Sequence, residues 1–491
     1  MALNLLLSIG SAWAAIMLWP FGGWARGVAG GFMAFAAWQL YSAAATPRRS
    51  SAQLVLRLAG FSWRMEDFCR GWLITGQVGT GKTTAAINTM LWQVSKSCPR
   101  WGGVCVDDKG LYWETLQPML RHLGREDDLI LLQVRPPQAR SNWHPAHTFN
   151  FLDNPHLPYS AKTKIVCDVA ASLGQRSDQT FFRMQAQVQM EFAFRVLAEA
   201  GHSVTLRHAY DFFTLDALQK EVMAMLGDQD SAEARMLVKH YEDSFLAQPP
   251  EQLGAVKTTL ANYLKYFTDP GIAEVFCPAK SSFSFDDLDR GKIVCVSLPQ
   301  RYQIERRYVN TLLKLSFYAH ALRRFDKPAA QRVSDNLLIL WADEAQKIVS
   351  AAEDGMSDYN VVDVIREARA TVVAATQSYQ SLIPPMGDER KAKVFIANMA
   401  NRVTFCAADE DSAKIAADTL GKRKAKRRTI GYTGGKRSSS WTEEDKYWFE
   451  PHQLRKLRKF EAVVQHCNRG FRKVRLRPCG PDGKAPSWYQ N

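Results

Sequence analysis

The sequence predicts an α/β fold built on a mainly parallel sheet, and three observations support this prediction. Short apolar runs alternate with amphipathic stretches along residues 48–491, as in sheets whose strands are connected by helices. A long helical pattern interrupts this series, and two apolar segments precede it. The expected strands are Trp72–Thr75, Gly103–Val106, Leu129–Val134, Lys292–Leu298, Leu337–Ala342, Thr371–Thr376, Arg402–Cys406 and Ala462–His466.

The two apolar segments, Ala2–Trp19 and Gly27–Ala45, occupy most of the first 47 residues. Each spans about 18 residues, close to the ~20 that a helix needs to cross the hydrocarbon core of a membrane. Pro20 lies at the turn between them, and Arg48 and Arg49 follow the second segment. Because positive charge favours the cytoplasmic side, we expect a transmembrane helical hairpin, with helices at 2–19 and 27–45, and the bulk of the chain in the cytoplasm.

A cleaved signal peptide is the competing interpretation of these segments, because Ser42–Ala45 resembles a peptidase site. Against it, two apolar runs occur rather than one, and no basic region precedes the first. We therefore favour a membrane hairpin at residues 1–47, with Thr46–Arg70 as a short linker to the next element.

The helical pattern runs from Tyr159 to Phe267, where apolar residues recur at intervals of three and four. It indicates an all-helical domain at 159–267, inserted into a sheet domain formed by 48–158 and 268–491. The Met and Phe residues of this insertion are expected to form core rather than a binding surface.

The net charge of +14 is concentrated near the end of the chain. Gly421–Asn491 contains 19 Lys or Arg against 6 Asp or Glu, which favours a polyanion partner, either nucleic acid or anionic lipid. Gly421–Ser440 is rich in charge, Gly and Ser, and we expect a mobile loop there. The later run "FRKVRLR" alternates like a strand with one basic face. The nine cysteines include no C-x-x-C pair, so no zinc or disulfide framework is expected.

The stretch from Gly76 to Thr83 matches the phosphate-binding pattern G-x-x-x-x-G-K-[ST] at every position. It follows an apolar strand and opens a helix, which is the context that the pattern requires. Lys82 is expected to reach the β- and γ-phosphates, and the Thr83 hydroxyl to coordinate Mg²⁺. The sequence therefore predicts binding of ATP with Mg²⁺. The expected nucleotide-binding residues of this loop are Gly76, Gln77, Val78, Gly79, Thr80, Gly81, Lys82, Thr83 and Thr84.

A paired carboxylate follows the apolar run at residues 337–342. Asp343, at the end of this strand, is expected to hold Mg²⁺, and Glu344 to polarise the attacking water as a general base. Gln377 follows the strand Thr371–Thr376 and is expected to sense the γ-phosphate. Joined to the phosphate-binding loop, these side chains predict an ATP hydrolase.

Two arginines, Arg366 and Arg369, precede that last strand in the run "IREARATVV". Either is a candidate arginine finger, which would stabilise transition-state charge at the nucleotide of a neighbouring subunit. A solvated helix face explains them equally well.

Further motifs run in order along almost the whole chain. They are "VDDKGLYWETL", "YFTDPGIAEVF", "FDDLDRGKIVCVSLP", "ADEAQ", "AATQSYQSL", "NRVTFCAADEDSAKIAADTLGK" and "FEPHQLRKLRKFEAVVQ". With the phosphate-binding loop, the apolar hairpin and the helical insertion, this series resembles the type IV secretion-system coupling proteins, which are conjugative DNA-transfer ATPases.

The resemblance implies a RecA-like P-loop nucleotide-binding domain and a homo-hexamer in the bacterial inner membrane, each subunit crossing it twice. It implies ATP-driven pumping of single-stranded DNA, with its attached relaxase, towards the channel components of a type IV secretion system. Asp107 and Lys109 match the acid and the lysine of the family's D-P-K-G stretch and are expected near the nucleotide. Asp108 replaces the usual proline, and the turn Pro20–Arg26 is shorter than the periplasmic segment that many members have.

Basic side chains beyond residue 420 are candidates for contacts to DNA phosphates inside such a ring. Trp441, Tyr447 and Trp448 are candidates for stacking on bases, although we expect core packing for at least two of them. Anionic lipid is the competing partner, because the membrane anchor would hold these charges near a bilayer. The candidate DNA-binding residues are Lys422, Arg423, Lys424, Lys426, Arg427, Arg428, Lys436 and Arg437.

Two other functions stay open at this point. A DNA translocase of the chromosome-segregation kind would share the nucleotide site, but the helical insertion argues against it. A membrane receptor for protein effectors, switched by ATP, belongs to a different class. Stimulation of ATP hydrolysis by DNA favours the pump, whereas stimulation by cargo protein alone favours the receptor.

Overall fold

The computed structural model describes residues 53–173, 180–352, 355–433 and 436–489, of which the part from Leu54 onwards forms one compact unit. The predicted membrane helices at 2–19 and 27–45 lie outside the described residues. Within the described ranges no helix is long and apolar enough to cross a membrane. The domain boundaries predicted at 47, 158 and 267 stay a prediction.

The largest sheet has nine strands in the order β13-β12-β9-β3-β8-β7-β4-β6-β5. Strands β9 to β5 in this order are parallel to one another, and β12 and β13 join the β9 edge antiparallel. All eight strands predicted for this sheet are confirmed, and β13 coincides with the predicted basic strand. Strands β1 and β2 form a separate two-stranded sheet, as do β10 and β11. The described strands of all three sheets are β1 (Leu54–Leu58), β2 (Phe61–Arg64), β3 (Trp72–Thr75), β4 (Gly102–Val106), β5 (Leu129–Gln133), β6 (Ile293–Ser297), β7 (Leu338–Ala342), β8 (Ala370–Thr376), β9 (Asn401–Thr404), β10 (Lys422–Thr433), β11 (Lys436–Tyr447), β12 (Glu461–His466) and β13 (Gly470–Arg475).

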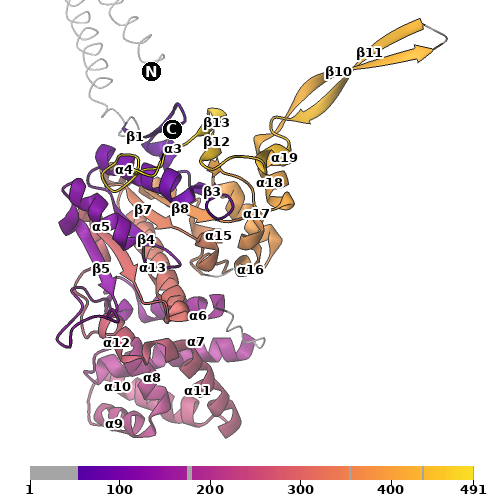
Figure 1. The fold of residues 1–491 in the computed structure, drawn as a ribbon. Helices are drawn as coiled ribbons and strands as arrows, with labels where there is room; N and C mark the ends of the chain where they lie inside the picture. Colours follow the sequence, from indigo (N-terminus) through magenta and orange to yellow (C-terminus); the bar gives the residue numbers. More distant parts are fainter. Residues whose placement is uncertain (1–52, 174–179, 353–354, 434–435, 490–491) are drawn as a thin grey trace, which may run out of the picture. The chain divides into compact units, whose positions relative to one another are not determined.

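Helices connect the strands and cover both faces of the sheet (Figure 1). The α-helices are α3 (Met65–Phe68), α4 (Asn88–Ser97), α5 (Trp113–His122), α6 (Tyr159–Ser172), α7 (Thr180–Glu199), α8 (Leu206–Thr214), α9 (Asp216–Gly227), α10 (Ala232–His240), α11 (Pro250–Leu264), α12 (Pro270–Phe276), α13 (Gln303–Arg323), α14 (Ala329–Arg332), α15 (Asp358–Val361), α16 (Ile383–Met386), α17 (Glu389–Asn398), α18 (Glu410–Leu420) and α19 (Pro451–Leu454). The π-helical turn η2 (Lys82–Ile87) leads into α4, and the π-helical turn η5 (Tyr241–Leu246) follows α10. The 3₁₀ turns are η3 (Glu126–Asp128), η4 (Phe151–Asp153), η6 (Lys265–Phe267), η7 (Phe285–Arg290), η8 (Arg324–Asp326), η9 (Ala345–Lys347), η10 (Ile365–Ala368) and η11 (Gln380–Leu382).

Alternate residues of the central strands face opposite sides of the sheet, as the two-residue period of a strand requires. On one side, Ile74 and Trp341 pack with the buried residues of η2, α4, α5 and the β1–β2 hairpin. On the other, Leu73 and Leu340 pack with α13 and the helices between α6 and α12. Since both faces are buried, these strands have continuous apolar sequences, which is why their positions could be predicted. The predicted core role of the Met and Phe residues in the helical insertion is confirmed in part. Met190 and its apolar neighbours are buried, whereas Met184, Met225 and Met236 are exposed.

The β1–β2 hairpin lies within the segment that was expected to be a linker. Its strands pair antiparallel, so the linker prediction is wrong for residues 54–64. Val55, Leu56 and Trp63 are fully buried among the residues of α4 and β3. The chain therefore enters its hydrophobic core much sooner than the sequence indicated.

The predicted mobile loop Gly421–Ser440 is also wrong, because β10 and β11 form a long antiparallel hairpin there. Lys424 and Glu443 lie 3.7 Å apart across the two strands, so an acid of β11 faces the basic residues of β10. Gly434 and Gly435, which lie outside the described residues, separate two runs of strand length. A Gly-Gly pair in this position is a hairpin signal. The charge density of the flanking residues, which is typical of loops, obscures this signal in the sequence.

Candidate nucleotide-binding site

The predicted nucleotide-binding residues come together because of the strand order. β8 lies between β3 and β7, and β4 lies on the other side of β7. Residues that follow these parallel strands therefore meet at the carboxyl edge of the sheet, where open α/β sheets bind ligands. A cavity of about 460 Å³ lies at this edge. It is lined by Val78, Gly79, Gly81, Lys82, Thr83, Thr84, Asp107, Asp108, Lys109, Leu111, Tyr112, Thr115, Asp343, Glu344, Lys459, Phe460 and Trp488.

The phosphate-binding loop has the backbone that its glycines allow. Gly76, Gly79 and Gly81 have φ angles of 154°, 78° and 109°, in the region that side chains disfavour. Gln77 N donates to the Cys406 carbonyl oxygen at 2.9 Å and so ties the loop to the residues after β9.

Lys82 is the residue of this loop whose side chain is expected to bind phosphate oxygens. Its Nζ donates to the Gly76 carbonyl oxygen at 2.7 Å, and the side chain is buried, with 7% of the residue exposed. Burial lowers the pKa of Lys82, while Glu344 and Asp343 act in the opposite direction. The ammonium group is thus held in the cavity at short range of two carboxylates.

Thr83 and Asp343 form a direct contact between the phosphate-binding loop and the end of β7. Thr83 Oγ1 donates to Asp343 Oδ2 at 2.7 Å, and burial raises the pKa of Asp343. A hydroxyl and a carboxylate are hard oxygen ligands, which Mg²⁺ prefers, usually together with substrate phosphates and water. Among the described residues no group of three or more His, Cys, Asp or Glu forms a metal cluster. The donor set therefore fits Mg²⁺ held jointly with a nucleotide rather than by protein alone.

Glu344 is positioned by two glutamines from neighbouring strand ends. Gln377 Nε2 donates to Glu344 Oε2 at 3.1 Å, and Gln346 Nε2 donates to the same oxygen at 2.5 Å. Thr376 Oγ1 in turn donates to Gln346 Oε1 at 2.8 Å. Glu344 has a φ of 54°, which is uncommon for a residue other than glycine and concentrates at functional sites. The carboxylate is therefore oriented by side chains and by backbone alike.

Asp107 and Lys109 lie at the same cavity, after β4. The Leu111 amide donates to Asp107 Oδ2 at 3.1 Å, and burial raises the pKa of Asp107. Gln300 Nε2 donates to the carbonyl oxygen of Lys109. Asp108, which replaces the proline usual in the family, lines the cavity as well.

Arg366 and Arg369 are not brought to this cavity. Both precede β8, and the cavity lies beyond the other end of that strand. Arg366 is exposed. Arg369 Nη1 donates to the Val333 carbonyl oxygen, and burial lowers the pKa of its guanidinium. Arg369 is thus part of the packing at the amino edge of the sheet.

Leu111, Tyr112 and Thr115 line the cavity although they were not predicted from the sequence. Lys459, Phe460 and Trp488 were missed as well. They lie near the chain's end, far in sequence from the phosphate-binding loop, and no local motif connects them with it. Only the position of β12 beside β9, together with the path of the last residues, places them at the site.

Comparison with protein families places the chain. Residues 55–476 match the model described as type IV secretion-system coupling protein DNA-binding domain. The chain belongs to the type IV secretion-system coupling protein family. This membership confirms the resemblance found in the motifs of the sequence.

Solved structures of the bacterial conjugative coupling protein TrwB resemble this coupling protein in fold. An unbound form is 18% identical, with 89% of this chain and 91% of that chain covered and a TM-score of 0.62. TrwB in complex with the non-hydrolysable GTP analogue GDPNP is 16% identical, with 90% and 92% covered and a TM-score of 0.61. TrwB in complex with ADP and Mg²⁺ is 17% identical, with 89% and 94% covered and a TM-score of 0.58. A comparison with curated proteins found no match. These likenesses confirm the α/β fold with a large, mostly parallel sheet.

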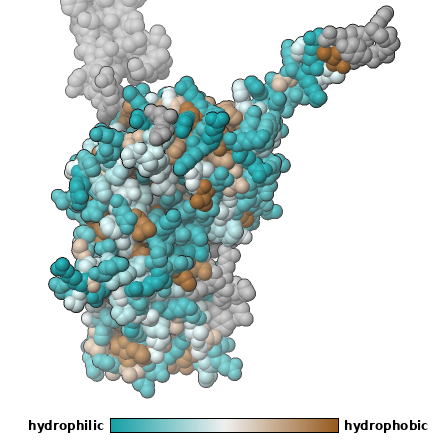
Figure 2. All heavy atoms as spheres, in the orientation of Figure 1, coloured by the Kyte–Doolittle hydropathy of each residue, from teal (hydrophilic) through white to brown (hydrophobic). Residues whose placement is uncertain are grey.

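The basic hairpin, which we define as β10 and β11, carries the candidate DNA-binding residues of this coupling protein. Lys424, Lys426 and Arg428 are exposed, and as alternate residues of one strand they share a face. Trp441 pairs with Arg428 across the hairpin and is 63% exposed. Figure 2 shows mostly hydrophilic residues on the visible surface and along the hairpin. The candidates Lys422, Arg423 and Arg427 are also exposed, whereas the side chains of Lys436 and Arg437 lie outside the described residues.

The expectation that at least two of the three hairpin aromatics pack in the core is wrong. Trp441 and Trp448 are both exposed, and Tyr447 donates from its hydroxyl to Asp418 Oδ1 at 2.7 Å. Each indole has a guanidinium over its ring, since Arg428 Cζ lies 5.7 Å from the Trp441 ring centroid and Arg423 Cζ lies 5.1 Å from that of Trp448.

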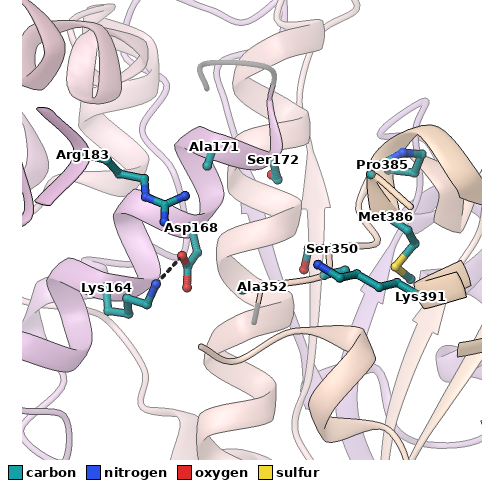
Figure 3. A pocket seen from close by; sticks show the side chains of 12 residues that line it. Lys164, Asp168, Ala171, Ser172, Arg183, Ser350, Ala352, Pro385, Met386 and Lys391 are labelled. Atoms are coloured by element: carbon teal, nitrogen blue, oxygen red, sulfur yellow. Dashed lines mark hydrogen bonds and ion pairs between the residues drawn. The ribbon is translucent and has the colours of Figure 1, made fainter. Parts of the chain in front are cut away.

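A second cavity, of about 310 Å³, contains none of the predicted residues. Figure 3 shows Lys164 and Asp168 of α6 on one side, Ser350 after β7, and Lys391 of α17 on another. Lys164 Nζ and Asp168 Oδ1 form an ion pair at 3.0 Å. Ser350 belongs to the segment that follows Glu344, and the buried Lys314 anchors this segment through the Ile348 carbonyl oxygen at 2.6 Å.

Proposed function

We propose that this coupling protein is an ATP hydrolase that uses Mg²⁺ and drives single-stranded DNA transfer. The observation that carries the proposal is the convergence of Lys82, Thr83, Asp343 and Glu344 at one cavity, with Gln377 beside Glu344. Phosphate-binding, magnesium-binding and base groups in this relation are the parts that phosphoryl transfer to water requires.

The geometry indicates how the site would work. The loop after β3 would bind the phosphates through backbone N–H groups, and Lys82 would exchange the Gly76 carbonyl oxygen for phosphate oxygens. When bound, Mg²⁺ supplies positive charge at the phosphate oxygens. Glu344, held by Gln346 and Gln377, would accept a proton from the attacking water.

The basic hairpin supports single-stranded DNA as the transported substrate. Exposed basic side chains and an exposed Trp441 on one face form the pattern of charge and stacking surface that binds single strands without reading sequence. Anionic lipid would reward the charges, and indole rings also favour the membrane interface, so experiment must separate the two partners. Binding of a chain lacking residues 1–47 to anionic vesicles that is as tight as its binding to single-stranded DNA would favour lipid.

The cellular setting is part of the proposal. Membership of the coupling protein family supports a place in the bacterial inner membrane, with residues 1–47 as the anchor and the rest in the cytoplasm. It equally supports relaxase-bound DNA and the type IV secretion channel as partners. Membrane fractionation of the full chain and of a chain lacking residues 1–47 tests the anchor, since both chains in the soluble fraction would exclude it.

A homo-hexamer with a finger in trans is the assembly that we propose. Of the two candidate arginines, the exposed Arg366 fits a contact with a neighbouring subunit better than Arg369, which is bound to Val333. Mixing Arg366→Ala chains with Lys82→Ala chains should restore hydrolysis that neither has alone, because each supplies what the other lacks. No gain on mixing would exclude the finger.

The direct test of the proposed function is phosphate release from ATP by the full chain, with and without Mg²⁺, single-stranded DNA and a relaxase. Hydrolysis that needs Mg²⁺ and rises with DNA supports the pump. Hydrolysis that rises only with the protein cargo supports the alternative, an ATP-switched receptor.

A further inference from the structure

Phe460, Trp488 and Lys459 line the same cavity as Lys82 and Thr83. They belong neither to the phosphate-binding loop nor to the carboxylate pair. The cavity is larger than its phosphate end, since Leu111, Tyr112 and Thr115 also line it. A nucleotide that fills the phosphate end has room in this space for its ribose and base.

The end of the chain is tied to the helix that follows the phosphate-binding loop. Cys479 N donates to the Thr84 carbonyl oxygen at 2.9 Å. Thr89 Oγ1 donates to the Arg477 carbonyl oxygen at 3.2 Å. These bonds hold residues 477–479 against that helix, and Trp488 further along lines the nucleotide cavity.

Phe460 is held against the loop itself. Its amide donates to the Thr80 carbonyl oxygen at 3.0 Å, and a Cβ on Gly81 would lie 2.5 Å from its ring atom Cδ1. Its φ of 68° is an outlier for a bulky residue, and such conformations persist only where the surroundings enforce them. The ring is therefore held rigidly against the phosphate-binding loop.

Trp488 stacks on this rigid ring and keeps much of its own surface open. The two ring centroids lie 6.0 Å apart with planes at 25°. Trp488 is 56% exposed, although a ring of this size contributes most when it is covered. Lys459 Nζ lies 5.6 Å from the Trp488 ring centroid and 5.2 Å from that of Phe460. The arrangement is an aromatic platform, built from Phe460 and Trp488, that lies beside a phosphate site with Lys459 over both rings.

We propose that Trp488, supported by Phe460, is the stacking surface for the nucleobase of the bound nucleoside triphosphate. The proposal rests on nucleotide binding at the proposed site and adds the part that recognises the base. The platform offers a π-face, and every base has a π-face. The structure therefore assigns a subsite that accepts adenine and guanine nucleotides alike and holds the base while the phosphates engage Lys82.

The test compares Kd values of the full chain, by calorimetry with Mg²⁺, for ATP, GTP and inorganic tripolyphosphate. Trp488→Ala should weaken ATP and GTP each by about tenfold, the order expected when one base–aromatic stack is removed. Tripolyphosphate, which has no base, should bind the variant within about twofold of wild type. Trp488→Phe keeps a flat ring and should retain most of the affinity.

Several results would overturn the proposal. An unchanged Kd for ATP in Trp488→Ala would show that the indole does not meet the base. An equal loss for tripolyphosphate would show that the substitution distorts the phosphate-binding loop instead. Loss for only one of the two nucleotides would exclude recognition through the π-face. A wild-type chain that binds neither nucleotide nor tripolyphosphate would overturn the nucleotide site itself, and this proposal with it. That outcome is distinct from the others, because they all require a wild-type chain that binds.

Discussion

Lys82 in the nucleotide cavity and Lys424 on the basic hairpin hold the same charge under opposite conditions. Lys82 is buried, and its ammonium group donates to the Gly76 carbonyl oxygen at 2.7 Å. Lys424 is exposed and has Glu443 at 3.7 Å, a distance and exposure at which an ion pair contributes little. The charged groups of the cavity are preorganised, whereas the charged groups of the hairpin are solvated by water.

The contrast indicates where specificity and where adaptability reside in this coupling protein. A buried, fully bonded group has one geometry, so its removal should have a large effect that no neighbour can compensate. Exposed charges act together and at longer range, so removal of each should have a small, salt-dependent effect. Catalysis requires the first arrangement, and passage of a moving polymer requires the second.

The largest expected effect is that of Lys82→Ala. The variant lacks the ammonium group that should hold the phosphates, so kcat/KM for ATP hydrolysis should fall by at least about 10³-fold. Circular dichroism and melting should stay close to wild type, because the substitution removes a short-range bond within one loop. Steady-state phosphate release checks this, and wild-type turnover in the variant would contradict the assignment of the cavity.

Glu344→Gln should separate binding from turnover. The amide keeps the size of the side chain but cannot accept a proton, so kcat should fall by about 10²- to 10³-fold while the Kd for ATP stays close to wild type. Titration with ATP and single-turnover hydrolysis measure the two quantities. Parallel loss of binding and turnover would assign Glu344 to nucleotide binding instead.

A smaller effect is expected on the hairpin from Lys424→Ala, Lys426→Ala and Arg428→Ala combined. The log–log salt slope of single-stranded DNA binding should fall by about 0.7 for each DNA phosphate that the variant no longer neutralises. Basal ATP hydrolysis without DNA should not change. The matched control removes three exposed charges of α9 and α10, with Lys220→Ala, Arg235→Ala and Lys239→Ala. The same loss of DNA affinity in both triple variants would reduce the hairpin to part of a diffuse field.

The smallest expected effect is on the free energy of unfolding, and it comes from a buried histidine that has no role in the nucleotide site. His466 of β12 is buried and stacks on Trp63 at 4.7 Å, and burial lowers its pKa from 6.5. Asp67, Arg469 and Arg70 are the charged groups that act on it.

The sign of the His466 effect follows from that direction. A lowered pKa favours the neutral ring in the folded state, so stability is fully present above pH 6.5 and should fall as the pH drops below it. His466→Gln should flatten this decline in urea unfolding, with ATP hydrolysis intact. An identical pH dependence in the variant would remove His466 as its source.

Much of the fold and of the candidate site could be predicted, because local sequence carries both. Strands such as β7 are buried on both faces and therefore read as continuous apolar runs. The phosphate-binding loop needs glycines within one short stretch, and Asp343 and Glu344 follow a strand whose end is visible in the sequence. The structure then showed how these parts meet, through the position of β8 between β3 and β7.

The parts that could not be predicted depend on contacts between distant segments. Val55 and Trp63 of the first hairpin are buried by α4 and β3 rather than by their own neighbours. The basic hairpin is stabilised across its two strands, while its sequence has the composition of a loop. Trp488 lines the nucleotide cavity, and Cys479 is bonded to Thr84; no spacing in the sequence indicates either contact.

The central claim is that the nucleotide cavity and the basic hairpin serve one reaction, and DNA-stimulated hydrolysis tests it most directly. Phosphate release by the full chain would be measured with and without single-stranded DNA, for the wild type and for the triple hairpin variant Lys424→Ala, Lys426→Ala, Arg428→Ala. The account predicts that DNA raises the wild-type rate, that the variant has the same basal rate, and that it needs more DNA for the same increase. A wild-type rate that is equal with and without DNA would contradict it.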